Sequence, residues 1–134
     1  MPAMNAVSHL RWLVADLAPG IRFWRDQVGL PQVVDVPGVY AEFASPGARI
    51  ALYRADLMAA VVGGPPAAGS GGDVVVCLRV DDVDRAAARL AAAGVIWVTP
   101  PHDEPVWRQR VAHVRDPAGH LVEIWTPLPA APAA

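Results

Sequence analysis

The sequence contains no lysine, and all 11 of its basic side chains are arginines. With a net charge of −2 and no run of basic residues, it lacks the usual signs of a nucleic-acid-binding protein. No uninterrupted apolar run reaches the length of a membrane span, and the first residues lack the basic and apolar regions of a signal peptide. A single cysteine, Cys77, excludes an internal disulfide and favours a reducing compartment. These absences predict a cytoplasmic protein that binds neither membranes nor nucleic acid.

What the chain does contain is enough apolar sequence for one compact domain. Its 134 residues are 54% hydrophobic, and a length in this range predicts a single domain over residues 1–134. A chain of this size buries roughly two-thirds of the surface that it exposes when unfolded, so a sizeable core is expected.

The same structural pattern occurs twice, about 66 residues apart. In each copy an apolar strand is followed by an aspartate that is suited to cap a helix (Asp16 or Asp82), then by a helical run and a glycine (Gly29 or Gly94). Short strands separated by turn residues complete each copy. The pattern predicts a first βαβββ module over residues 8–54, a flexible linker over 60–73, a second module over 74–126 and a flexible tail over 127–134.

Two segments make this ordering similar to a known superfamily. They are His9…Asp16-Leu17…Phe23-Trp24-Arg25…Gly29-Leu30 and Arg115-Asp116-Pro117-Ala118-Gly119-His120-Leu121-Val122-Glu123. Over residues 8–126 the chain resembles the vicinal oxygen chelate superfamily of glyoxalases, extradiol dioxygenases and bleomycin-resistance proteins. The resemblance implies an α+β fold in which the two βαβββ modules form curved mixed sheets around a cup. It also implies a homodimer.

The resemblance implies four positions at which metal enzymes of the superfamily place ligands. In this chain the first-strand positions are His9 and Val75, and the last-strand positions are Ala51 and Glu123. Only His9 and Glu123 carry donor atoms, whereas open catalytic zinc sites usually have three protein ligands. Three interpretations stay open: a divalent metal held by His9 and Glu123, a hydrogen bond between the two without metal, or a general base formed by the pair.

Strand alternation adds candidates that face the cup. His9 and Arg11 share one face of the first strand, and the twin strand sends Cys77 and Arg79 to the same side. Each arginine is expected either to bind a polar group of a ligand or to pair with an acidic residue at the rim. Cys77 is expected to be a small apolar filler.

Aromatic residues add a further set of candidates. Trp107 lies in a predicted loop over residues 100–110 and is suited to stack on a planar ligand. Tyr53 and Trp125 share strand faces with Ala51 and Glu123, and each is expected either to line the cup or to pack in the core.

The sequence therefore predicts a metal-free binding protein for a small aromatic or amphipathic molecule. In character it is closest to the bleomycin-resistance branch, whose members sequester a drug. A divalent-metal lyase or dioxygenase of the same superfamily is the alternative. The predicted ligand-binding residues are His9, Arg11, Tyr53, Cys77, Arg79, Trp107, Glu123 and Trp125.

Overall fold

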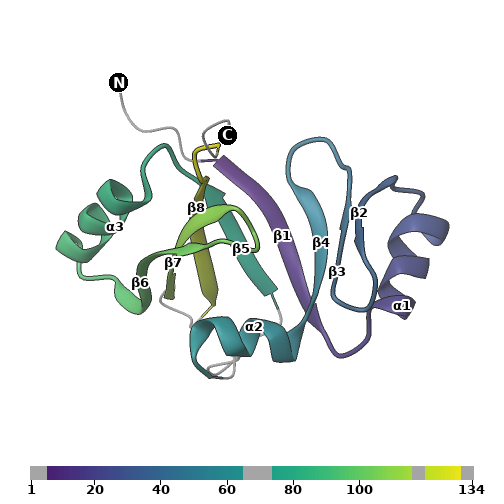
Figure 1. Ribbon diagram of the computed structural model, residues 1–134. Helices are drawn as coiled ribbons and strands as arrows, with labels where there is room; N and C mark the ends of the chain where they lie inside the picture. The colour runs from purple at the N-terminus through teal and green to yellow at the C-terminus, as the bar shows by residue number, and fades with distance from the viewer. Residues whose placement is uncertain (1–5, 65–73, 116–119, 131–134) are drawn as a thin grey trace.

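Eight strands form a single curved sheet in the computed structural model, which describes residues 6–64, 74–115 and 120–130 (Figure 1). The strand order is β2-β3-β4-β1-β5-β8-β7-β6. The strands are β1 (Ala6–Val14), β2 (Gln32–Val36), β3 (Tyr40–Phe43), β4 (Arg49–Arg54), β5 (Val74–Arg79), β6 (Ile96–Glu104), β7 (Gln109–Arg115) and β8 (Leu121–Pro127). The helical segments are α1 (Leu17–Ile21), its π-helical continuation η1 (Arg22–Gln27), α2 (Ala55–Val62) and α3 (Val83–Ala92).

The two halves of the sheet are copies of one module that meet at its centre. Strand β1 pairs in parallel with β4, and β5 pairs in parallel with β8. The two first strands then join antiparallel, which places His9 opposite Cys77 and Arg11 opposite Val75. The predicted α+β fold of two βαβββ modules is confirmed.

Equivalent residues begin and end the main helix of each module. The carboxylate of Asp16 accepts a hydrogen bond from Ala18 N at 3.2 Å, and that of Asp82 accepts one from Arg85 N at 3.0 Å. Gly29 and Gly94 follow the helices with φ of +90° and +82°, a conformation that glycine adopts without strain. Both predicted caps and both predicted stops are present.

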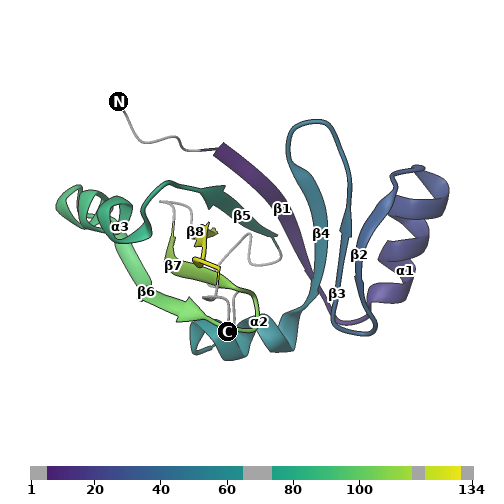
Figure 2. The ribbon, with the colours of Figure 1, turned by 45° about the horizontal axis from the view of Figure 1, so that its top comes forward.

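The helices lie on opposite faces of the sheet. The α1 segment covers Phe43 and Leu52, and α3 covers Ala112 and Ile124, at the two ends of one face (Figure 2). Helix α2 lies on the other face, called the cup face below, and inserts Met58 there. This alternation gives the sheet a core on each side and leaves part of the cup face free for a site.

Three boundaries differ from the sequence prediction. Residues 60–62, expected to begin the linker, are the last turn of α2, and the remainder of that linker from residue 65 lies outside the described residues. Strand β6 continues to Glu104, so the expected 100–110 loop shrinks to a turn over residues 105–108. Because β6 is an edge strand with register shifts, its two prolines remove no essential ladder bond.

At the C-terminal end, β8 extends to Pro127, the first residue of the expected tail, and residues 131–134 lie outside the described part. The turn residues 116–119 also lie outside it. Among the helices that the structure describes, none is long and apolar enough to cross a membrane.

Candidate binding site

A cavity of about 370 Å³ opens on the cup face of the first module. Strands β2, β3 and β4 form its wall, and the turn between β6 and β7 reaches across from the second module to complete it. The lining residues are Arg11, Val34, Val36, Val39, Tyr40, Glu42, Tyr53, Val106, Trp107 and Gln109. Valines and aromatic rings dominate this set, as is usual for small-molecule sites.

Three aromatic rings form a continuous wall of the cavity. The ring centroids of Tyr40 and Tyr53 are 5.8 Å apart, and those of Tyr53 and Trp107 are 6.1 Å apart, both in edge-to-face arrangements. Such pairs are favourable because the positive edge of one ring meets the negative face of the next. The predicted residues Tyr53 and Trp107 therefore line one cavity, and each also packs against a neighbouring ring.

Arg11, one of the lining residues, belongs to a buried ion pair that joins the two modules. Arg11 on β1 donates from Nη1 and Nη2 to the two oxygens of Glu123 on β8, at 3.0 and 3.1 Å. The same carboxylate accepts a 2.9 Å bond from His113 Nε2, and the Thr99 hydroxyl lies 2.7 Å from His113 Nδ1. Burial alone would raise the pKa of Glu123, but Arg11 and His113 outweigh it and hold that pKa well below its ordinary value.

One donor of Arg11 has no acceptor among the described residues. Its Nε is shielded from solvent and makes no hydrogen bond there, and the residue as a whole is only 7% exposed. The guanidinium carbon lies 5.9 Å from the ring centroid of Tyr53 and 5.7 Å from that of Trp107. A buried donor without an acceptor costs free energy, so the ion pair leaves one donor of Arg11 uncompensated.

A second polar cluster surrounds Glu42, which is not among the predicted ligand-binding residues. His9 Nε2 donates to Glu42 Oε1 at 3.0 Å, Arg49 donates to Oε2 at 2.8 Å, and the Tyr40 hydroxyl donates to Oε1. Burial would raise the pKa of Glu42, but these three donors outweigh it and lower the pKa to about 2.

The expected hydrogen bond between His9 and Glu123 is therefore wrong. Each residue faces the cup, but His9 pairs with Glu42 of its own module, and Glu123 pairs with Arg11 and His113. Arginine reaches Glu123 across β5 because its side chain is longer than that of histidine. The general base proposed for the His9–Glu123 pair consequently has no structural counterpart.

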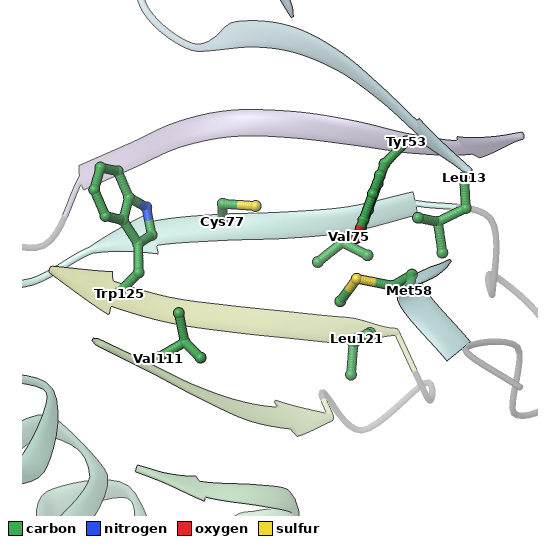
Figure 3. Close-up of a cluster of buried hydrophobic side chains, with 8 residues drawn as sticks. All are labelled: Leu13, Tyr53, Met58, Val75, Cys77, Val111, Leu121 and Trp125. Atoms are coloured by element: carbon green, nitrogen blue, oxygen red, sulfur yellow. The ribbon is translucent and has the colours of Figure 1, made fainter. Parts of the chain in front are cut away.

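The other predicted site residues lie beside the cavity rather than in its lining. Cys77 and Trp125 belong to a buried apolar cluster with Met58 and Leu121 (Figure 3). Trp125 donates its indole N–H to Ser8 Oγ at 2.9 Å, and the Arg79 guanidinium carbon lies 5.3 Å from the centroid of the Trp125 ring. Burial raises the pKa of the Cys77 thiol, which agrees with a filler rather than a nucleophile.

Comparison with known proteins agrees with this architecture. A model of the Glyoxalase/Bleomycin resistance protein/Dioxygenase superfamily matches residues 6–124. The chain belongs to this superfamily. The uncharacterized protein YraH of Bacillus subtilis (strain 168) is 33% identical to it over 120 residues, which cover 87% of this chain and 94% of YraH.

Two solved structures show the same superfamily architecture. Methylmalonyl-CoA epimerase from Mycobacterium tuberculosis is 26% identical, with a TM-score of 0.68 over 92% of this chain and 89% of its own. A glyoxalase/bleomycin resistance protein/dioxygenase superfamily member from Vibrio splendidus 12B01 is 15% identical, with a TM-score of 0.64 over 94% of this chain and 99% of its own. The second comparison supports the fold alone.

The donor set at the four metal positions of the superfamily does not fit a divalent metal. Strand pairing confirms the expected equivalence of two of these positions, because Ala51 lies opposite Arg11 as Glu123 lies opposite Cys77. Ala51 and Val75 offer no side-chain donor, and both oxygens of Glu123 accept from Arg11. Within the described ranges, no three His, Cys, Asp or Glu side chains group as a metal ion would need. The guanidinium of Arg11 supplies the positive charge beside Glu123.

Proposed function

We propose that this member of the superfamily binds a small aromatic or amphipathic molecule, without metal, in the cavity above Arg11. The observation that carries the proposal is the combination of an aromatic wall with Arg11, whose guanidinium is paired with Glu123. The rings of Tyr53 and Trp107 supply stacking surface, and the ion pair occupies the carboxylate that metal enzymes of the superfamily use. Drug sequestration, as in bleomycin-resistance proteins, is one role that such a site serves.

The electrostatics of the lining favour binding over proton transfer. Glu42 is the one carboxylate among the described residues of the lining, and three donors lower its pKa to about 2. A general base is most effective when its pKa lies near the operating pH, so Glu42 is a weak base at neutral pH. A binding role needs no such group.

The proposal is tested with the neutral fluorescent probe N-phenyl-1-naphthylamine. We expect saturable 1:1 binding that weakens about tenfold or more in Trp107→Ala, because the aromatic wall loses its outer ring. Trp97→Ala is the matched control, since Trp97 is 36% exposed on β6 and does not line the cavity. Equal weakening by both substitutions, or none by either, contradicts the proposal.

Metal dependence is tested on the same protein. Dialysis against EDTA is expected to leave the affinity for N-phenyl-1-naphthylamine unchanged. A tightly held, stoichiometric transition metal in the native protein that is lost in both His9→Ala and Glu123→Gln contradicts the metal-free assignment and favours the lyase or dioxygenase alternative.

A further inference from the structure

We infer that Leu128, the first residue after β8, is a positioning residue for the cavity, because its backbone N–H holds the turn that carries Trp107. The inference rests on the proposed function, since it concerns the aromatic wall of the same cavity. Its basis is one hydrogen bond, from Leu128 N to Arg108 O at 2.9 Å, together with the conformations of the segments that this bond joins.

The turn between β6 and β7 contributes a continuous part of the lining. Of the four consecutive residues 106–109, three line the cavity: Val106, Trp107 and Gln109. The fourth, Arg108, has a φ of +55° and is the one non-glycine residue with a positive φ in the described part of the chain. This conformation brings Cβ close to the following carbonyl oxygen, so it persists only where neighbouring contacts hold it. The position of Trp107 therefore depends on the contacts that hold Arg108.

Two backbone hydrogen bonds hold Arg108, one on each side of the residue. Its N–H donates to Pro105 O at 3.1 Å, and its carbonyl accepts from Leu128 N at 2.9 Å. The first bond lies within the turn and does not fix the turn to the rest of the protein. The second joins the turn to the C-terminal segment, one step beyond Gln109 and Pro127, which are paired between β7 and β8. Leu128 is thus the anchor of the turn outside the turn itself.

The sequence around Leu128 favours this bond. Leu128 lies between Pro127 and Pro129, so it carries the only backbone N–H of residues 127–129. Each proline fixes its own φ and disfavours the helical conformation in the residue before it. The segment consequently has few conformations to lose when the bond forms. The proline-rich composition that predicted a flexible tail from residue 127 therefore supports an ordered contact at the start of that tail.

The consequence for binding is that the aromatic wall is ordered before a ligand arrives. The Trp107 ring packs edge to face against Tyr53, with centroids 6.1 Å apart, and Leu128 is not among the described lining residues. If the bond to Arg108 is lost, a ligand must order the turn as it binds, which reduces its affinity. Leu128 therefore affects the affinity without contacting the ligand.

A matched pair of variants isolates the backbone bond. Leu128→Pro removes the N–H, whereas Leu128→Ala removes most of the side chain and keeps the N–H. The first readout is the indole N–H resonance of Trp107 in the ligand-free, ¹⁵N-labelled protein, identified by its loss in Trp107→Ala. We expect this resonance to shift or broaden in Leu128→Pro and to stay close to its place in Leu128→Ala. The resonance of Trp24, which packs on the other face of the sheet, is expected to stay in place in both.

An unchanged Trp107 resonance in Leu128→Pro, or an equal displacement in both variants, overturns the inference. The second readout is the affinity for N-phenyl-1-naphthylamine, which is expected to fall about fivefold in Leu128→Pro and to stay within about twofold in Leu128→Ala. Unchanged affinity in Leu128→Pro overturns the role of Leu128 in binding.

The two readouts keep the inference separate from the proposed function. If the wild-type protein does not bind the probe, the proposed function fails, while the ligand-free resonances still show whether Leu128 holds the turn. If Leu128→Pro does not fold, a chain that ends at Pro127 lacks the same N–H and takes its place in both measurements. A chain that ends at Ala130 is then the control, because it keeps Leu128.

Discussion

In the first module the cup face holds an open cavity, whereas in the second it is closely packed with buried side chains. Equivalent positions show the difference: Arg49 in the first module corresponds to Leu121 in the second, and Arg11 corresponds to Cys77. Figure 3 shows Met58 reaching from α2 toward Leu121 and Val75, so the helix that follows the first module fills the second. The repeat thus provides one packed half that holds the sheet together and one open half that is free to bind.

The second module also contains a buried charge, Glu123, whose cationic partner comes from the first module. Glu123 is 1% exposed, and its cationic partner Arg11 comes from the opposite module. A buried ion pair adds little net stability over an apolar pair, but the loss of one partner leaves an uncompensated charge. The ion pair therefore makes the two modules interdependent.

The strongest test of that dependence is Arg11→Met. Removing the guanidinium leaves a buried carboxylate that still accepts a hydrogen bond from His113 but has lost its cationic partner, and we expect the free energy of unfolding to fall by about 3–5 kcal/mol. Urea denaturation at pH 7 measures the change. The double variant Arg11→Met/Glu123→Gln is expected to recover more than half of the loss, and a loss below about 1 kcal/mol in the single variant would contradict the interdependence.

The contrast between the packed and the open half predicts that alanine substitutions at equivalent positions reduce the free energy of unfolding by unequal amounts. Leu121 is fully buried, so Leu121→Ala is expected to reduce the free energy of unfolding by about 2–5 kcal/mol. The Arg49 side chain is 49% exposed, so Arg49→Ala is expected to cost at most about 1 kcal/mol. Thermal unfolding of the two variants compares them directly, and equal losses would mean that the modules are packed alike.

A smaller effect follows from the pKa of Glu42. Because its folded-state pKa is lowered from 4.5 to about 2, ionised Glu42 stabilises the fold above pH 4.5, and this stabilisation is lost as the pH falls toward 2. The difference in stability between the wild type and Glu42→Gln is therefore expected to reach roughly 2–3 kcal/mol at neutral pH and to shrink below pH 4.5. A difference that does not change with pH would show that the hydrogen bonds to Glu42 do not depend on its charge.

The framework of the fold could be predicted from the sequence because its signals are local. Asp16 and Asp82 cap their helices through neighbouring backbone N–H groups, and strand alternation places Arg11 and Cys77 on the cup face whatever their partners are. Helix α2 was missed because the glycine-rich stretch after it obscured a helical run that has Asp56 in its first turn and Gly63 with a φ of +77° after its end.

The partners within the site could not be predicted because they depend on distances across strands. His9 and Arg11 are two residues apart on the same face, and their spacing along the strand does not tell which of them reaches Glu123. Tyr40 and Glu42 offered one usable signal, since alternation on a short strand places both on the cup face. The turn that brings Trp107 across from the second module has no comparable signal in sequence.

The most direct test of the account is a titration of the ¹⁵N-labelled protein with N-phenyl-1-naphthylamine, followed through the indole N–H resonances of its tryptophans. The account predicts that the Trp107 resonance, identified by its loss in Trp107→Ala, shifts on saturation, whereas the resonance of Trp24, which packs on the other face of the sheet, stays in place. A Trp107 resonance that does not move while the probe binds would show that the ligand is held elsewhere, and would contradict the assignment of the open half as the site.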